Sequence, residues 1–442
     1  MDSLGIESKT HAQQLEEKIR NHAARVGIVG LGYVGLPLGV EFARAGFPVT
    51  GIDIGEAKVA QVNAGDSYVL DVPGAVLGPL VERGRLRATT DFAVISELDT
   101  VNICVPTPLR KTKDPDMSYI DAACREIAHY IHPGMLVILE STTYPGTTDE
   151  FVLPMLEKSG LRVGRDFFLC FSPERVDPGN PKYQTANIPK VVGGITAACT
   201  HLGSLFYSQA LEQVVPVSST RVAEMVKLLE NTFLMINIGL VNELAMMCDR
   251  MGINVWEIID AAGTKPFGFM PFYPGPGLGG HCIPIDPFYL SWKTRQAGFE
   301  ARFIELAGYI NGQMPHFVVD KVQNALNDHN RPLRGSHVHI LGVAYKKDID
   351  DLRESPALDV MHLLLRRRAR VTYSDPYIPR VSVDGLELAA EPPEKMIPLA
   401  DCVVIVTDHA GFDYAALVEQ ARLIVDTRNA LKGCVSEKIV RL

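Results

Sequence analysis

Cys282 is the residue of this chain best suited to covalent chemistry. It lies in the segment Gly279-Gly280-His281-Cys282-Ile283-Pro284-Ile285-Asp286-Pro287. The two glycines before it let a ligand approach the backbone closely, and the prolines restrict the loop. A lone cysteine in an α/β protein is more often a small buried hydrophobic residue than a nucleophile. This loop nevertheless gives Cys282 the surroundings that a nucleophilic thiolate needs.

Four further polar residues stand where they could assist such a nucleophile. Lys227 and Asn231 are four residues apart in a helical segment, so their side chains differ by about 40° around the helix axis. Glu174 follows the apolar run FFLCFS, and Thr142 ends the run MLVILEST. Parallel α/β sheets present catalytic side chains at such strand ends. The alternative is that Lys227 and Asn231 are merely solvated surface residues.

A dinucleotide-binding motif lies near the start of the chain. Gly30-Leu31-Gly32-Tyr33-Val34-Gly35 stands between an apolar strand and an amphipathic helix. Its glycines allow a tight turn, close approach of a pyrophosphate, and packing of helix against strand. The next strand ends at Asp53, whose carboxylate can accept hydrogen bonds from ribose and would repel a 2′-phosphate. This predicts NAD over NADP, although Lys58 could weaken the discrimination.

The order of elements predicts an α/β protein with two Rossmann-like domains, joined by a long central helix and a helical dimerisation region. We expect a polar N-terminal extension (1–24), an NAD-binding domain (25–217), a central helical domain with the Gly/Pro loop (218–329), and a second Rossmann-like domain (330–442). Apolar runs alternate with amphipathic stretches in both Rossmann-like parts, as in βα units of a parallel sheet. The central helix is expected from about Ser219 to Gly252.

Composition excludes several classes of function. A net charge of −9 argues against a general nucleic-acid or anionic-membrane binder. The eight cysteines form no CxxC pair, so neither a zinc site nor any other metal site is expected. The N-terminal stretch has no apolar signal region, and no uninterrupted apolar run reaches transmembrane length. We therefore expect a cytoplasmic protein with free thiols.

Seven segments in order resemble the UDP-glucose/UDP-N-acetylhexosamine 6-dehydrogenase family. They are GLGYVGLPL, VPTP, ESTTYPGTT, SPERVDPG, KLLENTF, GPGLGGHCIPIDP and YKKDIDDLRESP, and the resemblance covers about residues 25–435. It implies NAD as cofactor, a UDP-sugar as substrate, and a homodimer or higher homo-oligomer.

The resemblance also implies roles for individual residues. Cys282 matches the nucleophile, and the positions around the reacting carbon are Lys227, Asn231, Asp286, Glu174 and Thr142. Cofactor-contacting positions are Gly30, Leu31, Gly32, Tyr33, Val34, Gly35, Asp53, Lys58, Val105, Thr107, Thr142 and Arg353. Substrate-contacting positions are Glu174, Arg175, Lys227, Asn231, Tyr273, Gly275, Gly279, Tyr345, Lys346 and Arg428. UDP-glucose enzymes carry an arginine near Lys265–Pro266 that this chain lacks.

Such an enzyme would remove two hydrides from the sugar C6 alcohol. The second can leave only from a tetrahedral adduct, which a cysteine thiolate makes by attacking the intermediate aldehyde; oxidation of this thiohemiacetal gives a thioester. Lys227 and Asn231 would stabilise the oxyanion. Glu174 with Thr142, or alternatively Asp286, would activate water for hydrolysis.

Several alternatives remain at this stage. The loop from Thr264 to Leu290 most resembles UDP-N-acetylglucosamine 6-dehydrogenases; UDP-N-acetylmannosamine or UDP-N-acetylgalactosamine come second and UDP-glucose third. A β-hydroxyacid dehydrogenase would need neither Cys282 nor the second Rossmann-like domain. A nucleotide-binding sensor or scaffold would have no reason to combine Cys282, Lys227 and Glu174. Two, one or no NADH per substrate would distinguish the three classes.

Overall fold

The computed structural model describes residues 9–69, 71–108, 115–177, 180 and 182–442. The first eight residues of the expected N-terminal extension, and Pro178 and Gly179 of the SPERVDPG motif, lie outside the described residues. The chain forms two compact units, Met1–Glu230 and Asn231–Leu442, and each is described by itself.

The first unit is built on a sheet with the strand order β3-β2-β1-β4-β5-β6-β7-β8 in the described part of the chain. Strands β1 to β6 are parallel, in the order typical of dinucleotide-binding folds. The strands are β1 (Val26–Val29), β2 (Val49–Ile52), β3 (Leu86–Thr89), β4 (Thr100–Ile103), β5 (Leu136–Leu139), β6 (Phe168–Phe171), β7 (Lys190–Gly194) and β8 (Val214–Val217).

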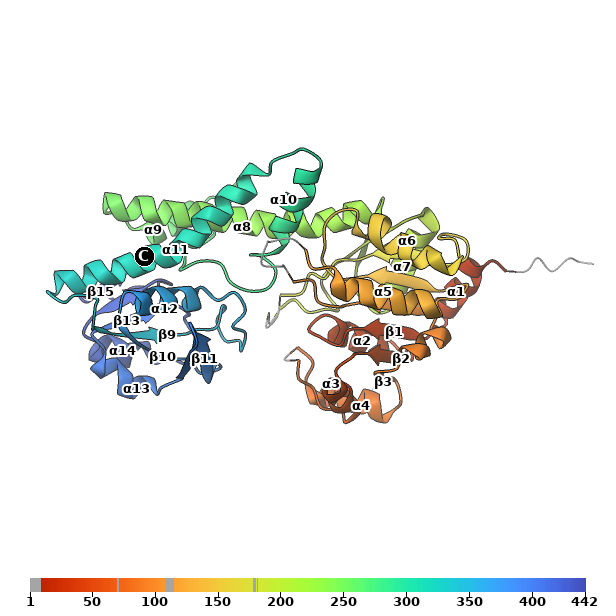
Figure 1. Cartoon of the computed structure of the whole chain (residues 1–442), viewed down its shortest axis with the longest axis horizontal. Coiled ribbons are helices and arrows are strands. Elements are labelled where there is room, and N and C mark those ends of the chain that lie inside the picture. Colours follow the sequence, from red (N-terminus) through yellow and green to blue (C-terminus); the bar gives the residue numbers. More distant parts are fainter. Residues whose placement is uncertain (1–8, 70, 109–114, 178–179, 181) are drawn as a thin grey trace, which may run out of the picture. The chain divides into compact units, whose positions relative to one another are not determined.

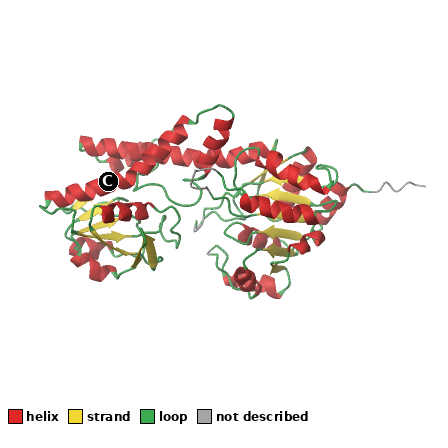
Figure 2. Cartoon of the chain, viewed as in Figure 1, coloured by secondary structure: helices red, strands yellow, loops and turns green. Residues whose placement is uncertain are grey.

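Helices cover both faces of this sheet (Figure 2). Alternate residues of β1 and β5 belong to different apolar clusters: Ile28 and Ile138 pack in one, Val29 and Leu139 in the other. The helical elements are α1 (His11–Arg20), α2 (Gly35–Arg44), α3 (Glu56–Asn63), α4 (Gly74–Glu82), η1 (Phe92–Glu97), α5 (Ser118–Tyr130), η2 (Thr147–Val152), α6 (Leu153–Leu156), η3 (Glu157–Ser159) and α7 (Ala197–Ser208). The expected α/β class is confirmed.

One sequence expectation for this sheet was wrong. The alternation of apolar runs predicted that all strands of this sheet are parallel, but β7, formed by the run KVVGG, is antiparallel to β6, with Phe171 opposite Gly193. The structure shows no helix between β6 and β7 in the described part of that connection. A parallel neighbour needs a long crossover, usually a helix, so a chain that returns without one pairs in the antiparallel sense.

The N-terminal helix α1 is part of the first unit. Leu15 and Ile19, four residues apart, are buried in the same apolar cluster as α2 and α7. The Lys18 ammonium also donates to Asp99 at 2.6 Å. Within the segment expected as a polar extension, residues from His11 onward are therefore anchored by an apolar face.

The long helix α8 (Thr220–Met251) runs through the boundary between the units. Its bounds agree with the predicted Ser219–Gly252 to within a residue. By length and composition alone α8 could cross a membrane, contrary to the expectation that no segment could, and 44% of its most apolar window is buried within the protein. Core helices of globular domains meet the same criterion, so this is weak evidence for a membrane span.

The second unit contains a parallel sheet with the order β10-β9-β13-β14-β15 in the region described (Figure 1). The strands are β9 (His337–Leu341), β10 (Arg370–Ser374), β13 (Cys402–Ile405), β14 (Ile424–Asp426) and β15 (Ile439–Arg441). The helical elements are α9 (Val255–Ala262), α10 (Asp286–Gln296), α11 (Arg302–Asp328), α12 (Pro356–Arg366), α13 (Pro393–Met396), η4 (Ile397–Leu399) and α14 (Tyr414–Gln420). This is the expected second Rossmann-like pattern.

An antiparallel hairpin in this unit was not predicted. Strands β11 (Arg380–Val383) and β12 (Leu386–Ala389) are joined by Asp384 and Gly385, both with positive φ. An Asp-Gly pair between two alternating runs is the sequence signal for such a turn.

Candidate functional site

The glycine motif after β1 has the geometry that a pyrophosphate site requires. Gly30 adopts φ +95°, and a Cβ there would lie 2.6 Å from the Cys104 carbonyl oxygen. A Cβ on Gly35 would lie 1.9 Å from the Gly30 carbonyl oxygen, so α2 can pack this closely only with glycine. A Cβ on Gly32 would meet no atom within 4 Å. Gly32 therefore borders open space into which a phosphate group could fit.

In the first turn of α2, the Leu36 N–H donates to the Gly32 carbonyl oxygen at 3.1 Å, and Pro37 has no N–H. Val34 stands at the N-cap and provides no side-chain hydrogen bond. The positive end of the helix dipole favours a bound anion at this position. The glycine loop and this helix end thus fit the diphosphate of a dinucleotide on stereochemical grounds.

Asp53 lies directly after β2 and braces the glycine loop. Its carboxylate accepts hydrogen bonds from the Leu31 and Gly55 N–H groups, each at 2.9 Å. The Lys58 ammonium lies 3.8 Å from the same carboxylate. The predicted ribose-binding residue is therefore in contact with the motif it was expected to serve, and Lys58 is adjacent to it.

The remaining predicted cofactor residues of the first unit follow β4 and β5. The Ser141 hydroxyl donates to the Val105 carbonyl oxygen at 2.7 Å and so joins the two strand ends. Thr107 and Thr142 are half-buried in the same two segments. Because β4 and β5 are adjacent and parallel, these segments lie at the carboxyl edge of the sheet.

Glu174 is surrounded by donors and cations. One carboxylate oxygen accepts from the N–H groups of Arg175 and Val176, at 2.7 and 2.8 Å, and the other accepts from the Lys190 ammonium at 3.3 Å. Burial raises the pKa of Glu174, but Lys190, these two N–H groups and the Lys227 charge outweigh it, so the pKa lies below its usual value. These surroundings therefore favour the ionised form of Glu174, and the charge of Lys227 contributes to the lowering of its pKa.

Behind Glu174 lies a buried polar network that was not predicted from the sequence. The Lys190 ammonium donates to Glu140 at 2.6 Å, and the Tyr207 hydroxyl donates to the other oxygen of Glu140. The Asn102 amide donates to Glu140 at 3.2 Å and to the Tyr207 hydroxyl at 2.9 Å. Buried ionic groups of this kind require complete pairing.

Arg175, a predicted substrate contact, has internal partners in this structure. Its guanidinium pairs with Glu230 at 2.6 Å and donates to the Pro189 carbonyl oxygen at 2.7 Å. These bonds fix the connection between β6 and β7 to α8. Its role toward a substrate stays a prediction.

Glu224 on α8 holds the loop that follows Thr142. Its carboxylate accepts from the N–H groups of Gly146 and Thr148, at 2.6 and 2.8 Å, and from the Thr148 hydroxyl at 2.7 Å. Burial raises the pKa of Glu224 to about 7 even though these three donors act in the opposite direction. Glu224 thus couples α8, which carries Lys227, to the ESTTYPGTT segment.

In the second unit, the Cys282 loop is joined to α8. The Cys282 carbonyl oxygen accepts from the N–H groups of Ile285 and Asp286, at 3.0 and 2.8 Å, which closes a turn at the start of α10. The Asn231 amide donates to the Asp286 carboxylate at 2.5 Å, and both side chains are buried. The structure therefore brings together Asn231, Asp286 and the Cys282 turn, while Cys282 itself stays partly exposed.

The glycines before Cys282 pack against the segment that follows β9. A Cβ on Gly279 would lie 2.6 Å from the Cβ of Tyr345, and one on Gly280 would lie 2.8 Å from the Tyr345 ring. The Gly280 N–H donates to the Arg353 carbonyl oxygen at 2.9 Å. The Arg353 guanidinium pairs with Asp351 at 2.6 Å, so its contact with the cofactor stays a prediction.

Arg428 lies against the same Gly/Pro loop. A Cβ on Gly275 would lie 2.6 Å from the Arg428 guanidinium, which also donates to the Val406 carbonyl oxygen at 2.8 Å. Burial lowers the pKa of Arg428. The expected substrate residues Gly275, Gly279, Tyr345 and Arg428 therefore line one region, at the carboxyl edge of the second sheet. Lys346 follows Tyr345 directly after β9.

Tyr273, in the same loop, contacts two residues of α9. Its hydroxyl donates to Asp260 at 2.8 Å, and its ring stacks on Trp256 with centroids 6.0 Å apart. Lys432 pairs with the same Asp260 at 2.7 Å. These contacts anchor the loop to α9.

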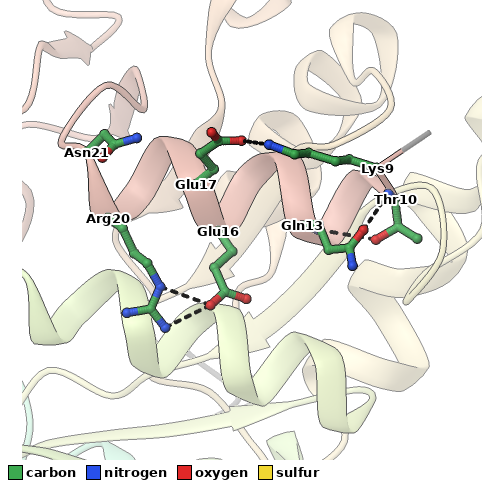
Figure 3. Close-up of a pocket in the computed structure, with 7 residues that line it drawn as sticks. All are labelled: Lys9, Thr10, Gln13, Glu16, Glu17, Arg20 and Asn21. Carbon is green, nitrogen blue, oxygen red and sulfur yellow. Dashed lines mark hydrogen bonds and ion pairs between the residues drawn. The ribbon is translucent and has the colours of Figure 1, made fainter. Parts of the chain in front are cut away.

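Neither a metal centre nor the surface depression along α1 belongs to this site in the part of the chain that the structure describes. Among the residues described, no group of three or more His, Cys, Asp or Glu side chains could hold a metal ion, and the cysteines form no disulfide. A surface depression along α1 is lined by one exposed helix with its own ion pairs (Figure 3), and its residues are Lys9, Thr10, Gln13, Glu16, Glu17, Arg20 and Asn21. None of the predicted site residues is among them.

Comparison with known proteins identifies the same family in three matched segments between residues 24 and 433. Models of the UDP-glucose/GDP-mannose dehydrogenase family match with its NAD binding domain (residues 24–211), its central domain (221–313) and its UDP binding domain (339–433). The chain is 37% identical to the UDP-N-acetyl-D-mannosamine dehydrogenase of Salmonella typhi, over 91% of this chain and 98% of that protein.

Two further relatives give the same result. The chain is 37% identical to the UDP-N-acetyl-D-glucosamine 6-dehydrogenase of Pseudomonas aeruginosa, over 80% of this chain and 83% of that one. The solved structure of the UDP-D-ManNAc dehydrogenase of Pyrococcus horikoshii superposes with a TM-score of 0.87 at 33% identity, covering 94% of this chain and 98% of that one.

Proposed function

Because the chain belongs to the UDP-glucose/GDP-mannose dehydrogenase family and is an NAD-dependent UDP-sugar dehydrogenase, we propose that it oxidises the C6 alcohol of a UDP-N-acetylhexosamine to the carboxylate. The observation that supports the covalent part of this proposal is the Cys282 turn. This turn ends at Asp286, which pairs with Asn231 in the protein interior. It is preceded by Gly279, which packs against Tyr345. A purely structural cysteine would need neither the glycines nor the paired amide and carboxylate.

The proposed reaction has two oxidations and one hydrolysis. The glycine motif and Asp53 would hold NAD, which would supply the hydride acceptor for both oxidations. In the first, the C6 hydroxyl loses its proton and C6 loses a hydride, which gives the aldehyde. The Cys282 thiolate then adds to the aldehyde carbon and forms a thiohemiacetal. Loss of the second hydride from this carbon gives a thioester, and water releases the carboxylate and regenerates the thiol.

The surroundings of Glu174 support its assignment as the base for the water. Its pKa is held below its usual value, so the carboxylate is ionised at neutral pH and can take a proton. Asp286, the competing candidate, is buried and already accepts the Asn231 amide at 2.5 Å. We therefore assign Glu174 to hydrolysis, assisted by Thr142, which follows the adjacent parallel strand β5. We assign Asp286 to the orientation of Asn231. Lys227 and Asn231 then stabilise the oxyanions.

For the sugar, we propose UDP-N-acetylglucosamine, because the Gly/Pro loop of this chain resembles that of the dehydrogenases for this sugar most. UDP-N-acetylmannosamine is the second candidate. The Salmonella typhi relative is as similar in identity as the Pseudomonas aeruginosa one and matches over a larger part of the chain. UDP-N-acetylgalactosamine and UDP-glucose follow.

A panel of these four UDP-sugars, assayed with NAD by NADH formation, tests the proposal. We expect kcat/KM for one N-acetylhexosamine to exceed that for UDP-glucose by about tenfold or more, as for a difference of about 1.4 kcal/mol in transition-state binding. The variant Cys282→Ser should still bind NAD but should not complete the oxidation to the carboxylate. Equal activity with UDP-glucose would refute the substrate class, and full turnover by Cys282→Ala would refute the covalent route.

The partner we propose for the central helices is a second copy of the chain. Phe233, Leu240 and Met247 recur every seven residues along α8 and are exposed. On α11, Phe303 and Tyr309 are exposed by 74% and 67%. Apolar side chains repeated along a helix face favour burial against another helix.

A further inference from the structure

Lys190 lies opposite Glu174 because β7 is antiparallel to β6. The register pairs Phe171 with Gly193, so continuing it three residues past β6 sets Glu174 against Lys190. The observed distance between the Lys190 ammonium and the Glu174 carboxylate is 3.3 Å. In a parallel sheet Lys190 would stand at the amino edge, about 15 Å away for a strand of this length.

The Lys190 side chain has no freedom to serve as a surface cation. It is 5% exposed, and its ammonium is held at 2.6 Å by Glu140, which is 1% exposed. Tyr207 and Asn102 donate to the far oxygen of Glu140 and fix it in turn. The Lys190 ammonium also lies 5.4 Å from the centroid of the Tyr207 ring. Each of these groups comes from a different element of the first unit.

We propose that Lys190 is a positioning residue for Glu174, which it fixes through one carboxylate oxygen and keeps ionised for the attack of water on the thioester. This inference rests on the proposed role of Glu174 as the base. The two oxygens of Glu174 have different partners: backbone N–H groups hold one, and Lys190 holds the other. Glu140 contributes indirectly, because its ion pair with Lys190 fixes the position of the Lys190 ammonium.

The charges around Glu174 determine how its protonation should respond to mutation. Lys190 and Lys227 favour the Glu174 carboxylate, and the charge of Glu174 raises the pKa of Glu140, so the two carboxylates repel each other. The Arg175 guanidinium is paired with Glu230. Removing Lys190 should therefore raise the pKa of Glu174, and removing the charge of Glu140 should lower it. A residue needed only for folding would produce no such opposite shifts.

The test is the pH dependence of thioester hydrolysis in Lys190→Met and Glu140→Gln. In the full-length enzyme with NAD and UDP-N-acetylglucosamine, we expect Lys190→Met to move the acidic limb of kcat upward by about one pH unit or more. Below that limb hydrolysis should fall about tenfold, and intact-mass spectrometry should find the sugar nucleotide on Cys282. Glu140→Gln, which is isosteric, should move the limb downward. Lys190→Arg, which retains the charge, should resemble the wild type.

Controls separate this proposal from its premise. Lys158→Met removes an exposed lysine from the same unit and should leave the profile unchanged. Glu174→Gln should reduce the rate of thioester hydrolysis by about a hundredfold if Glu174 is the base. A normal rate would refute the proposed role of Glu174 as the base, which is the premise of this inference. If Glu174→Gln fails to hydrolyse but neither Lys190→Met nor Glu140→Gln moves the limb, Lys190 is only structural. Glu140→Gln alone decides this if Lys190→Met does not fold.

Discussion

Glu224 gives a prediction whose magnitude follows from the structure. Its carboxylate is buried at the junction of α8 with the Gly146–Thr148 turn, and burial raises its pKa from 4.5 to about 7. A shift of about 2.5 units corresponds to about 3 kcal/mol at 1.36 kcal/mol per unit. Because the folded state has the higher pKa, it binds a proton that the unfolded state has released between these two pH values.

The sign of the effect follows from this difference. The contribution of protonated Glu224 to the free energy of unfolding is fully present below pH about 4.5 and is lost as the pH rises through about 7. The isosteric Glu224→Gln resembles the protonated form, so it should match the wild type in mild acid and be more stable by about 3 kcal/mol above pH about 8.

Urea unfolding of the full chain across this pH range, followed by circular dichroism, measures the difference. Glu243→Gln alters an exposed carboxylate on the same helix and serves as the control. If the donors from Gly146 and Thr148 outweigh burial, the wild type will instead be more stable than Glu224→Gln at neutral pH. That result would refute the reasoning.

Three further predictions concern the substrate, the cofactor and the partner copy. Arg428→Ala should raise KM for the UDP-sugar about tenfold or more through loss of a charged hydrogen-bond donor, while the Kd for NAD measured by fluorescence stays the same; an equal loss of NAD affinity would contradict this. The wild type should prefer NAD to NADP in kcat/KM, and comparable use of both cofactors would refute our interpretation of Asp53. Asp53→Ser should weaken NAD binding about tenfold, because the Leu31 and Gly55 N–H groups lose their acceptor. The same variant should also show a smaller preference for NAD over NADP. Phe303→Glu with Tyr309→Glu should shift the chain toward a monomer in light scattering, whereas an unchanged mass would exclude α11 from the interface.

The fold could be predicted from the sequence wherever a pattern is local. The glycine motif, the alternation of apolar runs and the unbroken helical spacing of α8 each depend on neighbouring residues, and all three are confirmed in the structure. The predicted direction of β7 was wrong, because the direction of this strand depends on whether a helix forms between β6 and β7. The run KVVGG has the same apolar pattern for either direction.

The site was predictable to a similar extent. Gly279, Tyr345 and Arg428 were expected at the substrate site, and Gly279–Tyr345 and Gly275–Arg428 are in contact in the second unit. Lys190 and Tyr207 were missed because nothing near either in sequence marks them as polar partners of Glu140. Only the reversed strand and the packing of α7 bring them together. The catalytic assignments remain predictions.

The ratio of NADH formed to UDP-sugar consumed tests the central claim most directly. With a limiting amount of UDP-N-acetylglucosamine and excess NAD, complete conversion should yield two NADH per sugar and a carboxylate at C6. Cys282→Ser should stop short of that yield. One NADH per sugar from the wild type, with an aldehyde as the final product, would contradict a four-electron oxidation through Cys282.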